Sequence, residues 1–276
     1  MQLYKKRVVD GVEMHEFGGA PIGKPAMTVY SYYLDGLLID TAQRHCEEAV
    51  KNTLTKRQIE QIALTHWHED HSGNAQLLQQ LTNAPIYAHE LTKQKLRTGF
   101  PILPYEYYFF GKIRPVTGVI LPMPESIETS RHRLVPIFTP GHSEDHYVFI
   151  ERNKGWLFAG DLFVGVKIKV FRKSENIHQQ IASIRQLLKE DFEVIFCGHS
   201  PQLSNGKALF QAKLNYFEEL VGKVLALHQQ GFSEREIRQQ LLIREAWGLR
   251  LFTFNDVGAT YLIRSAIEHQ PTPQLV

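Results

Sequence analysis

Three histidines and one aspartate fall within six consecutive positions of this chain. They belong to the run Thr65-His66-Trp67-His68-Glu69-Asp70-His71-Ser72-Gly73-Asn74. The hydrophobic pattern around the run predicts a strand before it and a helix after it. Such a density of ligating side chains in one turn is hard to explain by structure alone. Imidazole nitrogens and carboxylate oxygens suit zinc, and equally iron or manganese, so the run predicts part of a metal site.

A turn at a strand end can point His66 and His68 to one side and aim Asp70 and His71 into a neighbouring position. The run therefore predicts two incomplete half-sites lying close together. Three later ligands would complete them, and each follows a glycine at the end of a predicted strand: Gly141-His142, Gly160-Asp161 and Gly198-His199. Glycine lets the backbone turn tightly and approach a site closely.

The ordered set Asp40, His66-x-His68-x-Asp70-His71, His142, Asp161 and His199 resembles the metallo-beta-lactamase superfamily throughout the first domain. The resemblance implies a four-layer alpha-beta-beta-alpha sandwich. It also implies that His66, His68 and His142 bind one metal, that Asp70, His71 and His199 bind the second, and that Asp161 bridges both. Asp40 is then expected to support the ligand loop through hydrogen bonds. Two divalent ions are expected, with zinc first and iron or manganese as alternatives.

Short apolar segments alternate with helical patterns in the first 205 residues, which predicts an alpha/beta catalytic domain over residues 1–205. Strands are predicted at 28–34, 36–40, 59–65, 85–89, 134–139, 146–151, 156–159 and 193–197. Helices are predicted at 41–53, 72–81 and 177–189. Residues between 90 and 133 are expected to be irregular. Residues 206–276 form a predicted helical C-terminal segment, with helices at 208–229, 233–242 and 255–268.

Two segments near the site leave alternatives open. The aromatic loop at residues 100–110 is interpreted either as a lid or pocket wall, or as a packing segment or dimer contact. The alternating run from Lys167 to Lys173 could offer cations to an acidic substrate, although a half-exposed strand face is the preferred interpretation.

For His89, His146 and His178 a structural role is preferred, with support of a metal ligand as the alternative for His146.

The cellular context follows from three observations. The chain has only two cysteines, Cys46 and Cys197, which fits a reducing compartment, and a buried apolar role is expected for Cys197. The amino terminus shows no apolar signal core, and no apolar stretch is long enough to cross a bilayer. With 31 basic and 29 acidic residues the formal charge is +2, which gives no strong field for nucleic acid. We therefore expect a cytoplasmic protein with no membrane partner, and leave a homodimer open.

Two ions that share Asp161 would hold a bridging hydroxide, with Asp70 orienting it, so Asp70 and Asp161 are the predicted catalytic residues. The predicted function is hydrolysis of an ester-like bond in a small molecule, with a thioester or lactone favoured by resemblance to hydroxyacylglutathione hydrolase-like members. Three alternatives remain. Resemblance to small endoribonuclease-like members suggests cleavage of single-stranded RNA, ligand type allows an iron-dependent redox enzyme, and a degenerate site would leave a binding module.

Overall fold

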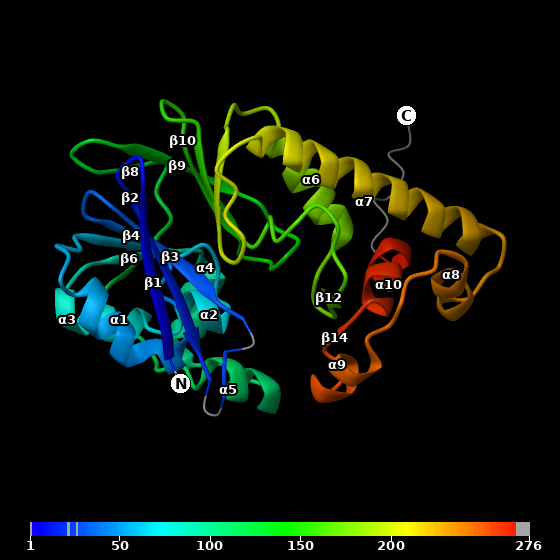
Figure 1. The fold of residues 1–276 in the computed structure, drawn as a ribbon, viewed down its shortest axis with the longest axis horizontal. Coiled ribbons are helices and arrows are strands. Elements are labelled where there is room, and N and C mark those ends of the chain that lie inside the picture. The colour runs from blue at the N-terminus through cyan, green and yellow to red at the C-terminus, as the bar shows by residue number, and fades with distance from the viewer. Residues whose placement is uncertain (1, 21–22, 26, 269–276) are drawn as a thin grey trace.

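Two sheets that face each other form the centre of the molecule, with helices outside both (Figure 1). The computed structural model describes residues 2–20, 23–25 and 27–268. Buried residues of both sheets pack in one hydrophobic cluster, in which the rings of Phe158 and Phe196 stack with centres 5.0 Å apart. Two further clusters lie on the outer faces of the sheets, beneath the helices. These three apolar layers confirm the predicted alpha-beta-beta-alpha arrangement.

The first sheet contains the amino-terminal half of the chain. Its strands, in spatial order, are β1 (Gln2–Val9), β2 (Val12–Gly19), β3 (Val29–Leu34), β4 (Leu37–Ile39), β5 (Gln61–Ala63), β6 (Ile86–Ala88) and β7 (Ile120–Pro122). The first four strands are antiparallel, and β4 to β7 are parallel. The hairpin of β1 and β2, which we did not predict, turns at Asp10 and Gly11, both of which have positive φ.

The second sheet has five strands from the later half of the chain. In spatial order they are β13 (Val194–Cys197), β11 (Trp156–Gly160), β10 (Tyr147–Glu151), β9 (Arg133–Phe138) and β8 (Ile127–Glu128). A separate antiparallel pair joins β12 (Phe171–Arg172) to β14 (Val257–Gly258). This pair connects the stretch between β11 and α6 to the C-terminal segment.

Helices cover the outer faces and form most of the C-terminal segment. They are a 3-10 turn (Arg44–Cys46), α1 (Glu47–Leu54), α2 (Glu69–Ser72), α3 (Ala75–Thr82), α4 (Glu90–Thr98), α5 (Pro104–Phe110), α6 (Ile177–Leu187), α7 (Gly206–Gln229), α8 (Glu234–Gln240), α9 (Trp247–Phe252) and α10 (Thr260–Glu268). Helix α7 packs beside α6, and residues of α6, α7 and α10 share one hydrophobic cluster with the second sheet. The division at residue 205 stays a prediction, although α7 begins there. None of the described helices is long and apolar enough to cross a membrane.

The predicted irregular stretch between residues 90 and 133 was wrong, because it contains α4, α5, β7 and β8. Helix α5 lies within the predicted aromatic loop, where Pro104 occupies the first helical turn and the Glu106 carboxylate accepts a hydrogen bond from the Leu103 N–H. The strand interpretation of residues 167–173 was also too long, since only Phe171 and Arg172 pair. The last predicted helix begins at Thr260 rather than 255.

Candidate metal centre

The seven predicted ligands meet at one end of the sandwich, where four strands terminate. His66, His68, Asp70 and His71 follow β5, His142 follows β9, Asp161 follows β11 and His199 follows β13. Their ligating atoms fall in three overlapping groups, and within each group all atoms lie within 4.8 Å of one another. The groups are His66, His68 and His142; His66, His71 and Asp161; and Asp70, His71 and His199.

Two of these groups have the membership expected for the two metals. The carboxylate of Asp161 lies between them, with Oδ2 at 3.6 Å from His142 Nε2 and 3.3 Å from His199 Nε2. The other oxygen of Asp161 is 3.3 Å from His71 Nε2. The structure thus brings all seven side chains together, while metal binding by each of them stays a prediction.

The all-histidine group has the chemistry of a metal site. His66 Nε2 lies 2.8 Å from His68 Nδ1, which lies 3.0 Å from His142 Nε2, so three nitrogens converge on one region. Burial lowers the pKa of His66 and of His68 well below the usual value. Both rings are therefore uncharged near neutral pH, which is the form that binds a metal ion.

The carboxylate-containing group has buried atoms that lack hydrogen bonds. His71 Nε2 and Asp161 Oδ1 lie within ion-pair distance of each other, at 3.3 Å, but neither atom makes a hydrogen bond within the described part of the chain. Burial opposes protonation of His199, yet the carboxylates of Asp161 and Asp70 hold its pKa well above the usual value. Buried polar atoms without partners are costly, and a cation would satisfy them here. The seven donors therefore fit a pair of divalent ions.

Asp40 holds the ligand loop in place. Its Oδ1 accepts a hydrogen bond from the Thr65 N–H at 2.8 Å, and its Oδ2 accepts one from the Thr65 hydroxyl at 2.9 Å. His71 Nδ1 donates to the same Oδ2 at 2.7 Å. Because Nδ1 carries the proton, Nε2 is the nitrogen presented to the centre. Asp40 has the supporting position that the resemblance implied.

His146 supports the site from behind. The backbone N–H of Asp161 donates to His146 Nε2 at 3.1 Å, and Nδ1 of the same ring contacts the Thr139 hydroxyl at 2.9 Å. Gly160 leaves room for this ring, since an added Cβ would lie 2.6 Å from His146 Nε2. His146 thus fits the alternative of supporting a ligand. The structural roles preferred for His89 and His178 are confirmed, because they bond Leu91 N and Ala266 O respectively.

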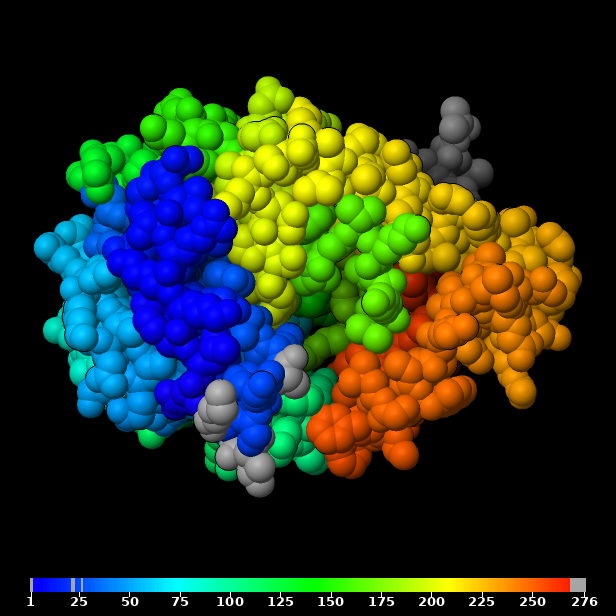
Figure 2. Space-filling view, in the orientation of Figure 1, coloured from blue at the N-terminus to red at the C-terminus, as the bar shows by residue number. Residues whose placement is uncertain are grey.

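A cavity of about 390 Å³ opens beside the predicted ligands. Its walls are mainly apolar and come from both halves of the chain, including Phe109, Phe110, Ile168, Leu249 and Val257. The rings of Phe109 and Phe252 lie 5.5 Å apart, so α5 contacts α9 at the lower edge of the view in Figure 2. The aromatic segment is therefore a pocket wall, one of its two predicted roles.

Two cations line this cavity: the buried Lys213, which the sequence did not suggest, and the partly buried Arg172, for which a solvated strand face was the preferred interpretation. Arg172 Nη1 pairs with Glu106 Oε1 at 3.0 Å. Burial raises the pKa of the nearby Glu69 carboxyl to about 8, and the positive charge of Arg172 opposes this rise. Lys213 Nζ donates to the Leu162 carbonyl at 2.8 Å and has no carboxylate partner within ion-pair distance among the described residues. The signal for Lys213 was its position between Phe210 and Phe217 on the apolar face of the predicted helix.

The buried thiol of Cys197 stays outside the ligand set. Its sulfur accepts a hydrogen bond from Ser200 N at 3.3 Å, and the side chain is fully buried. Burial raises its pKa to about 11. The predicted role as a small buried apolar residue is confirmed.

Comparisons with known proteins agree with this geometry. The family described as the metallo-beta-lactamase superfamily matches residues 29–199, which include all seven predicted ligands. The beta-lactamase-like protein 2 homolog of Caenorhabditis elegans is 26% identical over 237 residues, covering 80% of this chain and 72% of that protein. The thioesterase pkgB of Emericella nidulans is 26% identical over 212 residues, covering 72% of this chain and 53% of that protein.

A solved structure shares the fold over almost the whole chain. A metallo-beta-lactamase family protein from Thermus thermophilus superposes with a TM-score of 0.65 at 22% identity. The superposition covers 94% of this chain and 92% of that one, so it extends into the C-terminal helical segment.

Proposed function

The chain belongs to the metallo-beta-lactamase superfamily, and on this basis we propose that it is a metal-dependent hydrolase of an ester-like bond in a small molecule. A thioester or a lactone is the favoured substrate. The observation that carries the proposal is the convergence of seven buried or half-buried donors beside a largely apolar cavity. Similarity to a protein named as a thioesterase supports the first of the two bond types.

The proposed division of roles keeps the two half-sites. His66, His68 and His142 would hold one ion, Asp70, His71 and His199 the other, and Asp161 would contact both. When bound, two divalent ions lower the pKa of water toward neutrality and polarise the carbonyl or phosphoryl oxygen under attack. Zinc is the proposed metal, with iron and manganese as outcomes of the elemental analysis described below.

The protein's own groups orient the reaction. Asp70 lines the cavity, and its Oδ2 lies 3.3 Å from His199 Nε2, which fixes the direction of the carboxylate. From this position Asp70 can accept a proton from the attacking water. The apolar walls, with Phe109 and Phe110 among them, would hold an acyl group and exclude bulk water.

The experiment that tests this proposal joins metal content to activity. We expect elemental analysis of the purified protein to give about two metal equivalents. We also expect a chelator to abolish hydrolysis of the best member of a panel of thioesters, lactones and one RNA oligomer. Hydrolysis of RNA alone would replace the small-molecule proposal with the nuclease alternative. One iron per chain with no hydrolysis would favour redox chemistry.

Lys213 gives a prediction about substrate charge. Lys213 is among the residues that line the cavity, and its ammonium is buried. We expect Lys213→Met to raise KM about tenfold for a thioester that carries a carboxylate on its acyl group, which corresponds to the loss of one charge-assisted hydrogen bond. Burial lowers the pKa of Lys213 to about 8, so its charge is lost as the pH rises through that value. In the unmodified protein the same KM should therefore increase from pH 7 to pH 9.

The half-exposed Lys207 on the same helix, which pairs with Asp191 at the surface, provides the matched control, because Lys207→Met removes one lysine charge outside the cavity. Steady-state kinetics with a neutral and an anionic thioester separate the two roles open to Lys213. An equal fall in kcat for the neutral and the anionic thioester would mean that Lys213 does not bind the substrate. Its role would then be to position the turn at Asp161 and Leu162 through its hydrogen bond to the Leu162 carbonyl.

Location and assembly complete the proposal. Cys46 and Cys197 are both free and buried, in keeping with a reducing compartment such as the cytoplasm. The homodimer left open by the sequence remains a prediction, to be measured by light scattering.

A further inference from the structure

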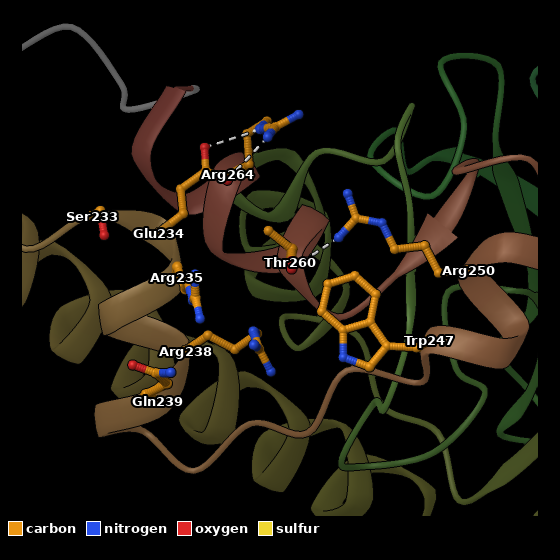
Figure 3. Close-up of a pocket in the computed structure, with 9 residues that line it drawn as sticks. All are labelled: Ser233, Glu234, Arg235, Arg238, Gln239, Trp247, Arg250, Thr260 and Arg264. Atoms are coloured by element: carbon orange, nitrogen blue, oxygen red, sulfur yellow. Dashed lines mark hydrogen bonds and ion pairs between the residues drawn. The ribbon is translucent and has the colours of Figure 1, made fainter.

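A second pocket of about 790 Å³ lies in the C-terminal segment, among α8, α9 and α10 (Figure 3). Four arginines and one tryptophan dominate its lining: Arg235, Arg238, Arg250, Arg264 and Trp247. We call this the arginine pocket. It contains none of the predicted metal ligands and none of the residues that line the cavity beside them. The arginine pocket is therefore separate from the site proposed for hydrolysis.

The arginine pocket carries excess positive charge. Arg264 forms two hydrogen bonds with the Glu234 carboxylate, both at 3.0 Å, and Arg250 Nη1 lies 3.3 Å from Glu245 Oε2. Arg235 and Arg238 have no carboxylate within ion-pair distance in the described parts of the chain. Two guanidinium charges thus remain without a counter-ion on one side of α8. Such an excess of positive charge favours the binding of an anion.

Two of the arginines, Arg238 and Arg250, are held in fixed directions. The guanidinium carbons of Arg238 and Arg250 lie 5.8 and 5.6 Å from the centre of the Trp247 ring, within cation–π distance. Arg238 Nη1 donates to the Ile243 carbonyl at 3.2 Å, and Arg250 Nε donates to Asn255 Oδ1 at 3.1 Å. Figure 3 shows the Arg238 side chain directed toward Trp247. Side chains that are ordered in advance lose less entropy when a ligand binds.

Trp247 adds an exposed aromatic surface to this charge. Its side chain is 64% exposed, which is unusual for a tryptophan unless it meets a ligand or partner. Guanidinium groups present planar forks of N–H donors that match the oxygens of phosphate. The combination of several such forks with one indole fits a phosphate-bearing small molecule better than a single halide or carboxylate.

We propose that the arginine pocket binds the polyphosphate group of a small molecule, with Arg235 and Arg238 as the principal phosphate contacts. The pocket volume of about 790 Å³ and the nearly balanced charge of the chain, with a formal net charge of +2, favour a compact ligand over a nucleic acid. Inorganic pyrophosphate and a nucleoside diphosphate share the required chemistry. The proposal is independent of hydrolysis at the metal centre.

Calorimetric titration of the metal-loaded protein with pyrophosphate and with ADP tests the proposal. We expect saturable binding of both at near-physiological ionic strength, and at least about tenfold weaker binding in the Arg235→Gln/Arg238→Gln double variant. Arg7→Gln/Arg244→Gln removes the same charge from exposed positions outside the pocket and should leave both affinities unchanged. Tighter binding of ADP than of pyrophosphate would indicate that the nucleoside contacts Trp247. Equal affinities would indicate that the pocket recognises the phosphates alone.

Several outcomes would overturn the proposal. The first is the absence of saturable binding, and the second is equal weakening of binding in both double variants. The third is binding that is lost in Asp161→Ala but kept in Arg235→Gln/Arg238→Gln, because this result would place the anion at the metal centre. Pocket-dependent binding of an RNA oligomer more tightly than ADP would replace the small-molecule ligand with nucleic acid. The Arg235 side chain makes no hydrogen bond or ion pair with any residue that the structure describes. Arg235→Gln alone, expected to bind the ligand several-fold more weakly, therefore provides a variant whose folding is not at risk.

Discussion

Replacing His66 or Asp161 with alanine is expected to remove bound metal and to lower kcat/KM for the best substrate by at least about 10³-fold. His66 belongs to two of the three ligand groups, and Asp161 contacts both His142 and His199, one from each predicted half-site, so each substitution would weaken the whole centre. Elemental analysis and steady-state kinetics on the same preparations measure both effects. Loss of metal and of activity should therefore occur together.

His178→Ala is the matched control for this experiment. His178 bonds the Ala266 carbonyl and lies outside the ligand groups, so its loss should leave metal content and kcat/KM near those of the unmodified protein. Full metal content in His66→Ala and in Asp161→Ala would show that the ligand assignment is wrong. Metal loss with unchanged hydrolysis would instead separate the metal centre from the activity.

The ligand run was predictable because its chemistry is local in sequence. Four ligands lie within six consecutive residues that run from the end of β5 into α2, so short-range geometry brings them close: His66, His68, Asp70 and His71. The partners His142, Asp161 and His199 could be added because glycines mark the ends of their strands. Asp40 was placed correctly through the resemblance, since nothing in its own neighbourhood specifies a hydrogen bond to a ring 31 residues away.

The missed features depend on tertiary contacts. Helix α5 was read as a loop because its aromatic residues show no clear helical period, yet its packing against α9 and the pairing of Glu106 with Arg172 stabilise it. The pair β12 and β14 joins residues 171 and 258, a separation that no local pattern reveals. Lys213 is buried on α7, but a charged residue is ordinarily expected at the surface, so the sequence did not indicate its position.

Gly198→Ala is expected to lower kcat/KM at least about 10²-fold and to reduce metal content, although only one methyl group is added. An added Cβ would lie 2.4 Å from Asp161 Oδ1 and 2.7 Å from His71 Cε1, so one or both predicted ligands must move. Neither can move freely. The backbone N–H of Asp161 is bonded to His146, and the ring of His71 is bonded to Asp40. A displaced ligand cannot hold the position that the metal requires.

Gly222→Ala provides a control with the same chemical change. Gly222 is exposed within α7 and has no atom within 4 Å of an added Cβ, so alanine should leave activity unchanged and raise the free energy of unfolding by about 0.5–1 kcal/mol. Thermal melts, metal content and kinetics of both variants would be compared. If Gly198→Ala stayed folded, fully metal-loaded and active, the close approach of β13 to Asp161 and His71 would not be a requirement of the centre. If Gly198→Ala lost metal but kept a cooperative thermal melt, the added methyl group would have displaced the metal ligands while leaving the rest of the core intact.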